Sequence, residues 1–499
     1  MLQLDRTPIV SLVQSREIDR CTILDYHIPD IVLMEEAAER IFSDLIYRFR
    51  HHKTKLFNKI SIIVYPGNNG ADLLSIARKL YLNGFTNIEL FILQPDKIKE
   101  DSLFDKHYKV INSLSMSINS LFQDYEKLKE SSLIIDGLFG TGFRSRQSDI
   151  VTSKLHISIE SIIDFINSLN KPIISIDIPS ALDSVKKTGL KACFTYSIGF
   201  YKQEFYNIQS RAKCGSIKNI PISFVFDPVT CKYFHIDRIR FKYPDDRFVN
   251  KYSRGGLMVI GGGHGTWGAV CYSINAAYSV GSGIVCLLTE ETDIQTVNPM
   301  LKNTVIAGFD NIDDHISKYN TILIGPGLKL KNQRYKLIES ILRQKENIVI
   351  DASFFTLFDC SILDRIKSTP IVTPHTKEFS VFFNIDIETL KQDTINIVSM
   401  IASKYKIFIV LKDQFITVGM PDGTVNVYDK QVRIAAQAGS GDILAGIIAG
   451  FLSQTGDPAY SIYAGIESFY RSLKKISINK ILSYNPDLLL EQLRMATNG

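Results

Sequence analysis

The 499-residue chain has little of what marks several classes of protein. Its 57 basic and 52 acidic side chains leave a net charge of only +5, which argues against nucleic acid or an anionic membrane as a partner. The longest unbroken apolar run, 443–452, has ten residues, whereas a membrane-spanning helix needs about 20. Asp5 and Arg6 precede any long apolar run, so we expect no secretory signal peptide.

Cysteine and tryptophan are sparse as well. The seven cysteines are scattered and form no C-x-x-C pair, so we expect neither a zinc site nor a disulfide framework, but reduced thiols in a cytoplasmic protein. Trp267 is the only tryptophan, and packing explains it as well as function does. The 45% of apolar and 22% of charged residues are ordinary for a globular protein, which excludes disorder as the main state.

The chain alternates short apolar runs with segments of helical spacing. Strands that are apolar throughout and separated by helices predict an α/β protein, with parallel sheets covered on both faces. In the first half, the predicted strands are 59–65, 87–93, 133–136 and 172–178, and the predicted helices are 71–84 and 157–169. In the second half, the predicted strands are 257–260, 321–324, 347–350, 370–373, 407–411, 415–418 and 424–428, with helices at 269–280, 440–453 and 458–472.

Residues 227–250 interrupt this alternation, because they are rich in charged and aromatic side chains and contain Pro228 and Pro244. We place a domain junction there and predict two domains, 1–229 and 230–499. Each is large enough to bury its own core. Because ligands of open α/β sheets bind at the carboxyl ends of the strands, the loops after those strands are the candidate sites.

Three strand ends in the first half carry unusual polar residues. In 66–72, glycines at a strand-to-helix turn would let backbone amides approach an anion. In 136–146, a carboxylate precedes a glycine loop with two arginines, which suit phosphate oxygens. In 177–183, Asp177 ends a buried strand, where a carboxylate is costly unless it is paired or used. A plain turn, a solvated loop and a capping residue are the alternative explanations.

Asn69, Asp136 and Ser180 could supply oxygen ligands to one hard cation. One charged ligand among neutral oxygens suits a monovalent ion better than magnesium.

These segments, together with Arg16-Glu17-Ile18-Asp19 and Val32-Leu33-Met34-Glu35, resemble NAD(P)H-hydrate epimerase over about residues 10–220. The resemblance implies a Rossmann-like three-layer sandwich that interconverts the R and S epimers at the hydrated carbon of the nicotinamide ring. It implies potassium at Asn69, Asp136 and Ser180, and Asp177 as the general acid or base. The implied substrate-binding residues are Asn68, Asn69, Gly70, Ala71, Asp72, Gly140, Thr141, Gly142, Phe143, Arg144, Ser145 and Arg146.

The chain departs from the epimerase pattern at Tyr65, Ala71, Leu73 and Ala181, where that family usually has glycine. Leu73 could fill space that the ligand needs. Alanine at position 181 is tolerable only if the backbone there has a negative φ. A catalytically inactive ligand-binding module therefore remains an alternative for the first half.

The sharpest pattern of the second half is 438–446, Ala-Gly-Ser-Gly-Asp-Ile-Leu-Ala-Gly. Free amides at the start of a helix near Ser440 would form an anion hole. Asp442, in the first turn, is placed to accept the proton of a hydroxyl that attacks a γ-phosphate. A capped helix packed by small residues is the structural alternative. No G-x-x-x-x-G-K-[ST] pattern is present, so a P-loop fold is not expected.

This pattern resembles the ribokinase-like superfamily. Residues 240–475 are similar, more narrowly, to the dehydratase that repairs hydrated NAD(P)H, and three segments carry this resemblance: 261–269, 325–327 and 373–378. The resemblance implies contacts of Ala269, Gly327 and His375 with the hydrated nucleotide, with a surface histidine as the alternative for His375. It implies ADP or ATP with magnesium, and Asp442 as the catalytic residue. The implied nucleotide-binding residues are Lys412, Gly439, Ser440 and Gly441.

This half also departs from its family. Asp413, Gln414 and Phe415 replace the usual loop after Lys412, and an aspartate there would repel phosphates. Thr376 and Lys377 replace a proline and a glycine.

The sequence thus predicts a bifunctional enzyme that epimerises NAD(P)H hydrate and dehydrates its S form at the expense of ADP or ATP. Phosphorylation would turn the ring hydroxyl into a good leaving group. The alternative is a small-molecule kinase fused to an inactive ligand-binding module. We expect small-molecule ligands, no nucleic acid or membrane partner, and a homo-oligomer.

Overall fold

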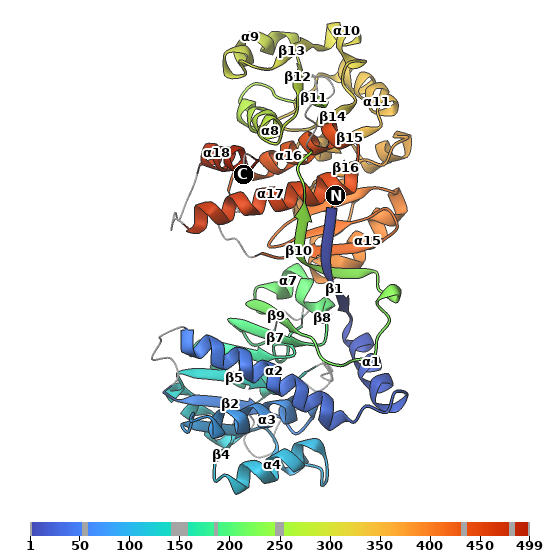
Figure 1. Cartoon of the computed structure of the whole chain (residues 1–499). Helices are drawn as coiled ribbons and strands as arrows, with labels where there is room; N and C mark the ends of the chain where they lie inside the picture. Colours follow the sequence, from blue (N-terminus) through green and yellow to red (C-terminus); the bar gives the residue numbers. More distant parts are fainter. Residues whose placement is uncertain are drawn as a thin grey trace. The chain divides into compact units, whose positions relative to one another are not determined.

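The computed structural model describes residues 2–51, 58–140, 158–183, 188–244, 254–430, 437–478 and 485–497. It divides into two compact units (Figure 1). The N-terminal unit is Thr7–Cys231, and the C-terminal unit is Lys232–Gly499 together with Met1–Arg6.

The N-terminal unit is built on a seven-stranded parallel sheet in the order β4-β3-β2-β5-β6-β7-β9. Its strands run through β2 (Ile60–Val64), β3 (Ile88–Ile92), β4 (Ser117–Ser120), β5 (Leu133–Gly137), β6 (Ile173–Ile176), β7 (Phe194–Ile198) and β9 (Ser216–Ile220). In this unit the end of β1 (Leu2–Val10) also pairs with β8 (Tyr201–Lys202). The central strands are buried along their whole length, because helices cover both faces.

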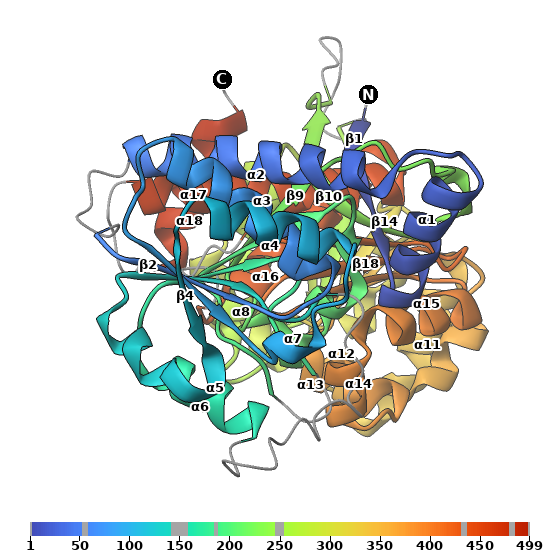
Figure 2. The ribbon, with the colours of Figure 1, turned by 90° about the horizontal axis from the view of Figure 1, so that it is seen from below.

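Three layers result (Figure 2). One face of the sheet packs against α2 (Asp30–His51), α3 (Asn68–Leu82) and α4 (Leu103–Ser113), and the other against α5 (Leu121–Asp124) and α6 (Ile159–Ser168). Two further helices, α1 (Leu12–Leu24) and α7 (Ile208–Arg211), complete the unit. The expected three-layer sandwich is confirmed.

The C-terminal unit contains the sheet order β13-β12-β11-β14-β15-β16-β17-β18-β19-β10, followed by the start of β1. From β13 to β10, neighbouring strands are parallel except for the antiparallel pairs β17-β18 and β18-β19. Its strands are β10 (Tyr233–Phe241), β11 (Gly256–Ile260), β12 (Ile284–Thr289), β13 (Val305–Gly308), β14 (Thr321–Ile324), β15 (Asn347–Ile350), β16 (Ile371–Val372), β17 (Phe408–Lys412), β18 (Ile416–Gly419) and β19 (Val425–Tyr428). The α/β class with parallel sheets is confirmed.

The strand β10 lies inside the segment that we interpreted as a break in the pattern. It pairs in parallel with β19 and buries His235, Ile236 and Ile239, while Asp237 and Arg238 stay exposed. Because exposed charged residues interrupt its apolar residues, a search for continuous apolar runs misses this strand.

The helices of the C-terminal unit form two layers. On one face, α8 (Trp267–Ser279), α16 (Ser440–Thr455), α17 (Pro458–Ile478) and α18 (Pro486–Thr497) share one apolar core. The contact of α16 with α8 is close, because a Cβ on Gly446 would lie 2.2 Å from the Ser273 carbonyl oxygen. The remaining helices are α9 (Ile294–Val297), α10 (Asp313–Ile316), α11 (Tyr335–Gln344), α12 (Phe354–Leu357), α13 (Thr376–Phe383), α14 (Ile387–Gln392) and α15 (Thr394–Tyr405).

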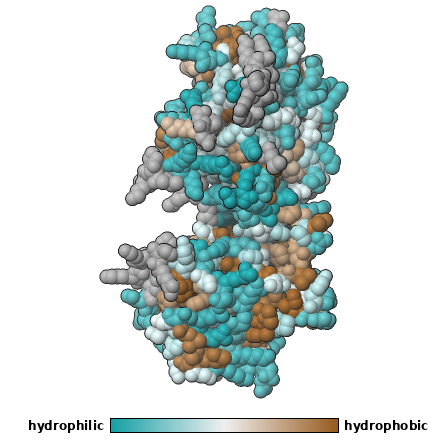
Figure 3. Space-filling model, in the orientation of Figure 1, coloured by the Kyte–Doolittle hydropathy of each residue, from teal (hydrophilic) through white to brown (hydrophobic). Residues whose placement is uncertain are grey.

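In the part of the chain that the structure describes, no helix is both long and apolar enough to span a membrane. On the face shown in Figure 3, apolar and polar residues are interspersed.

Candidate active sites

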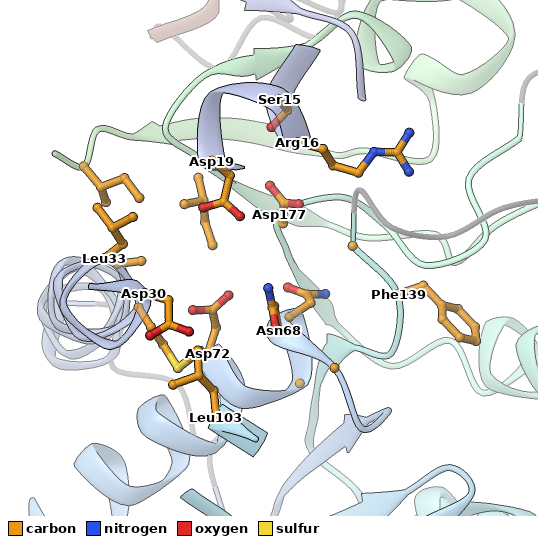
Figure 4. Close-up of a pocket in the computed structure, with 18 of the residues that line it drawn as sticks. Ser15, Arg16, Asp19, Asp30, Leu33, Asn68, Asp72, Leu103, Phe139 and Asp177 are labelled. Atoms are coloured by element: carbon orange, nitrogen blue, oxygen red, sulfur yellow. The ribbon is translucent and has the colours of Figure 1, made fainter. Parts of the chain in front are cut away.

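A cavity of about 350 Å³ lies in the N-terminal unit. It is lined by α1, by α2, by the first turn of α3 and by the segments that follow β5 and β6 (Figure 4). Four carboxylates reach it, from Asp19, Asp30, Asp72 and Asp177. The cavity lies at the carboxyl ends of the parallel strands, where a ligand site is expected.

The segment expected as a turn, 66–72, belongs mostly to a helix. Helix α3 begins at Asn68, so Asn68–Asp72 form its first turn, and no side chain caps its start at Gly67. Its first amides therefore have no partner within the helix. A Cβ on Gly70 would lie 2.1 Å from the Tyr65 carbonyl oxygen, so only glycine fits there.

The expectation that Leu73 could fill the ligand space is wrong. Leu73 is fully buried in the core on the α3 face of the sheet, and it is not among the residues that line the cavity. Its side chain packs against Gly137, where an added Cβ would lie 2.8 Å from it. Ala71 is buried in the same core.

The three predicted potassium ligands differ in their surroundings. The Asp136 carboxylate is held by hydrogen bonds: its Oδ1 accepts from the Ser180 hydroxyl at 2.6 Å, and its Oδ2 accepts from the Ser180 amide at 2.9 Å and the Ser175 hydroxyl at 2.8 Å. Burial raises the pKa of Asp136. Both polar side-chain atoms of Asn69 are buried without a hydrogen-bond partner among the described residues, which is uncommon for buried polar atoms.

Asp177 is the best-defined group of this cavity. Its Oδ1 lies 2.9 Å from the ammonium nitrogen of Lys202, which is almost fully buried and also donates to the Ile198 carbonyl at 2.7 Å. Its backbone has a φ of +67°, in the left-handed region that non-glycine residues rarely adopt. Such strain persists at sites where the surroundings enforce it.

Gly140 brings two predicted groups together. A Cβ on Gly140 would lie 3.1 Å from the Asn69 Cβ and 3.3 Å from Asp177 Oδ2. The remaining predicted residues of this loop, Thr141, Gly142, Phe143, Arg144, Ser145 and Arg146, lie outside the described residues.

Ala181 fails the condition stated for it, because its φ is +56°. An alanine therefore occupies a left-handed position where the family usually has glycine.

In the C-terminal unit, helix α16 begins at Ser440 as predicted, after Gly439 with a φ of +87°. Asp442 stands in its first turn, and the Ser273 hydroxyl donates to the Asp442 carbonyl at 3.0 Å. Burial, followed by the charge of Asp351, raises the pKa of the Asp442 carboxyl to about 7, although Lys412 opposes this. A carboxyl that titrates near neutral pH suits a general base.

Lys412 is held at the same place. Its ammonium nitrogen lies 2.7 Å from Asp351 Oδ1 and 3.3 Å from the position of a Cβ on Gly441. Asp351 also accepts from the Thr373 hydroxyl at 2.6 Å. Sequence reasoning missed Asp351, although it directly follows the predicted strand 347–350, and this place was a signal that could have found it.

His375 begins helix α13, and its Nδ1 accepts from the amides of Lys377 at 3.1 Å and Glu378 at 3.2 Å. These two hydrogen bonds cap the helix, and the His375 side chain is 52% exposed. Burial and then Lys412 lower the pKa of His375. Burial raises the pKa of Glu378 to about 7, with Asp351 and Asp442 adding to the effect.

The structure also gives the positions of Ala269 and Gly327, the other residues predicted to contact the hydrated nucleotide. Ala269 lies in the first turn of α8, and the Thr266 hydroxyl donates to the Gly327 carbonyl at 2.7 Å. Trp267 is buried, and a Cβ on Gly262 would lie 2.4 Å from its ring, so Trp267 packs. The Asp413 carboxylate, expected to repel phosphates, accepts a hydrogen bond from the Thr376 hydroxyl.

The fold and the sites define a two-domain α/β enzyme. Residues 257–494 match the family model described as NAD(P)H-hydrate dehydratase, and residues 30–204 match the one described as YjeF-related protein N-terminus. The chain is 30% identical over 476 residues to the bifunctional NAD(P)H-hydrate repair enzyme Nnr of Dictyoglomus turgidum, covering 89% of this chain and 90% of the relative. It is 25% identical to the enzyme of the same name from Moorella thermoacetica, covering 92% and 90%.

The chain belongs to the family of bifunctional NAD(P)H-hydrate repair enzymes. Its predicted family and its repair of NAD(P)H hydrate are confirmed. Among solved structures, a ribokinase-like superfamily protein from Enterococcus faecalis V583 is similar, with 24% identity, a TM-score of 0.45, and coverage of 51% of this chain and 90% of that one.

Proposed function

We propose that the repair reaction of the C-terminal unit takes place at the head of α16, with Asp442 as the general base and with ADP or ATP as the phosphoryl donor. The observation that carries this assignment is the carboxylate of Asp442 in the first turn of α16, with a pKa of about 7 and beside the buried ammonium of Lys412. Gly439 and Gly441 would present backbone amides to the transferred phosphoryl group. The Ser440 amide already donates to the Gln437 carbonyl at 3.1 Å, so Ser440 would contribute through its hydroxyl.

In this proposal Asp442 accepts the proton of the ring hydroxyl as that oxygen attacks the terminal phosphorus of the nucleotide. The bond from that phosphorus to the bridging oxygen breaks, and AMP leaves from ADP, or ADP from ATP. The phosphorylated oxygen then leaves as phosphate with the electron pair of its carbon–oxygen bond, assisted by the lone pair of the ring nitrogen. Loss of a proton from the neighbouring ring carbon to solvent restores the carbon–carbon double bond. Lys412 supplies a fixed positive charge where negative charge develops, and Asp351 holds it there. Ala269, Gly327 and His375 would hold the hydrated nucleotide.

Magnesium would accompany the nucleotide in this proposal. Glu378 and Asp442 are two carboxyls whose pKa values burial raises, and the charge of Asp442 adds to the rise at Glu378. A divalent cation bound with the nucleotide would supply the positive charge that favours both ionised forms.

For the N-terminal unit, we assign epimerisation to the cavity around Asp177. Asp177 lies in this cavity with the Lys202 ammonium 2.9 Å from its Oδ1, and we assign it as the base toward the hydroxyl of the hydrated carbon. Asn68–Asp72 and Gly140–Arg146 would hold the dinucleotide.

We propose potassium at the residues predicted for it, Asn69, Asp136 and Ser180. In support, Asn69 offers a buried carbonyl oxygen without a partner among the described residues, and the Ser180 hydroxyl lies 2.6 Å from the Asp136 carboxylate. When bound, the ion would supply a positive charge that opposes the effect of burial on Asp136. Asn69→Ala is expected to abolish the rise in melting temperature that potassium gives over sodium.

Two variants of the full chain test these assignments, and each serves as the control for the other. Asp442→Asn should leave epimerisation intact and abolish NAD(P)H formation from hydrate with ADP, followed by the absorbance of the reduced nicotinamide. Asp177→Asn should convert only the S fraction quickly, with the rest limited by the uncatalysed epimerisation measured without enzyme.

Two results would contradict the proposal. If Asp442→Asn restored NAD(P)H at the wild-type rate, Asp442 would not be the general base of the reaction. Complete conversion by Asp177→Asn at the wild-type rate would support an inactive N-terminal module. Phosphorylation of a vitamin or sugar alcohol without any restoration of NAD(P)H would favour the small-molecule kinase.

A further inference from the structure

Helix α1 contributes a carboxylate to the N-terminal cavity that the proposed mechanism leaves unused. A capping box between Ser11 and Gln14 fixes the start of this helix. Ser15 and Asp19, four residues apart and therefore on one face, both line the cavity. Glu17 lies on another face, where it pairs in solvent with Arg20.

Asp19 has no hydrogen bond or ion pair within the described residues, although it is only partly accessible. Figure 4 shows its carboxyl group and that of Asp177 turned toward the same space, while Arg16 points away from Asp19. Burial raises the pKa of Asp19, and the charges of Asp177 and Asp30 add to this, while Lys202 opposes them.

The two neighbouring carboxyls therefore differ in a useful way. Asp177 has a cationic partner, because the ammonium of Lys202 lies 2.9 Å from its Oδ1. Asp19 has no such partner among the described residues and faces like charges, which favour its protonated form. One carboxyl beside a cation and a second among carboxylates are the arrangement of a base and an acid.

We propose that Asp19 is the catalytic acid of the epimerase site and works as a pair with Asp177, the base. This inference rests on the proposed epimerase function of the cavity.

The hydrated carbon of the substrate carries a hydroxyl and is bonded to the ring nitrogen, so it is a hemiaminal. Asp177 removes the hydroxyl proton, the carbon–oxygen double bond forms, and the carbon–nitrogen bond breaks with its electron pair going to nitrogen. Asp19 delivers its proton to that nitrogen. After the freed carbonyl rotates, Asp19 takes the proton back, nitrogen attacks the opposite face, and Asp177 returns its proton to oxygen. The enzyme ends unchanged, and the carbon is inverted.

The test compares Asp19→Asn with Glu17→Gln, which makes the same carboxylate-to-amide change on the exposed side of the same helix. Epimerisation of purified hydrate is followed by separating the two epimers chromatographically, without ADP. Because general acids contribute about a hundredfold or more, Asp19→Asn should lower kcat at least that much, while Glu17→Gln should match the wild type. NAD(P)H formation from the S epimer with ADP should be unchanged in both.

The pH profile separates catalysis from a structural role. In the wild type, kcat should fall with rising pH as Asp19 loses its proton. The other charged groups at the cavity, among the described residues, are Asp30, Asp72, Asp177, Arg16, Lys202 and, beside Lys202, Glu204. Asp19→Asn should lose the falling limb. Asp19→Glu, which keeps a carboxyl, should retain it at reduced kcat and carries the test if the asparagine variant does not fold.

Wild-type kcat in Asp19→Asn, or a falling limb that persists in it, would overturn the role of Asp19 alone. So would a falling limb that is absent from Asp19→Glu. A wild-type enzyme that does not epimerise the hydrate would overturn the proposed epimerase function and this inference together.

Discussion

Removing the charge of Asp442 should stabilise the C-terminal unit, and the gain should grow with pH. Burial and Asp351 raise the pKa of this carboxyl from 3.8 to about 7 in the folded protein. Between these two values the folded state binds more protons than the unfolded state, so stability falls as pH rises. Asp442→Asn cannot ionise and therefore escapes this loss.

The size of the effect follows from the shift. Three pKa units correspond to about 4 kcal/mol, which is the cost of the ionised carboxyl at pH 8. At pH 5 the unfolded carboxyl is ionised but the folded one is not, and the cost is about 2 kcal/mol. The advantage of Asp442→Asn over the wild type should therefore increase by about 2 kcal/mol between pH 5 and pH 8.

Trp267 provides the assay, because it is the only tryptophan and is buried in α8 of the C-terminal unit. Urea unfolding of both proteins, followed by the fluorescence of Trp267 at pH 5 and pH 8, gives their free energies of unfolding. The measured quantity is the change between the two pH values in the difference between the variant and the wild type. Any effect of the amide on packing is common to both pH values and cancels. An advantage that stays constant or shrinks from pH 5 to pH 8 would refute the raised pKa.

Two glycine substitutions test close contacts. Gly140→Ala would place its Cβ 3.3 Å from Asp177 Oδ2. By displacing this carboxylate it should lower the kcat of epimerisation about tenfold, while dehydration stays unchanged. An equal loss of both activities would contradict this. Gly446→Ala would meet the Ser273 carbonyl oxygen at 2.2 Å; it should destabilise the C-terminal unit by about 1–2 kcal/mol in the Trp267 assay, and unchanged stability would show that α8 and α16 can separate at no cost.

Local signals in the sequence predicted where several residues of both candidate sites lie in the fold. The run of small residues before an apolar segment placed the start of α16 at Ser440, because that start depends on neighbouring residues alone. The apolar strands ending at Asp136 and Asp177 likewise brought their carboxylates to one edge of a parallel sheet.

Partners that come from distant parts of the chain could not be found in this way. Lys202 reaches Asp177 from β8, and no local pattern distinguishes it from other lysines. Asp19 is separated from Asp177 by more than 150 residues of sequence, and only the fold brings α1 to the cavity.

The prediction for Leu73 failed for a different reason, because it did not take into account which face of the helix this residue lies on. It follows Asp72, which lines the cavity, but it is turned by one helical step into the sheet and packs against Gly137. Ala181 was judged by the right criterion, yet its φ of +56° could only be learned from the structure.

The central claim is that one chain carries two working sites, and a single incubation tests it most directly. Wild-type enzyme is mixed with both epimers of NAD(P)H hydrate and ADP, and the reduced-nicotinamide absorbance is followed to its end. The account predicts that all of the hydrate returns to NAD(P)H, faster than uncatalysed epimerisation allows. A fast phase that stops at the fraction of the S epimer would contradict the claim.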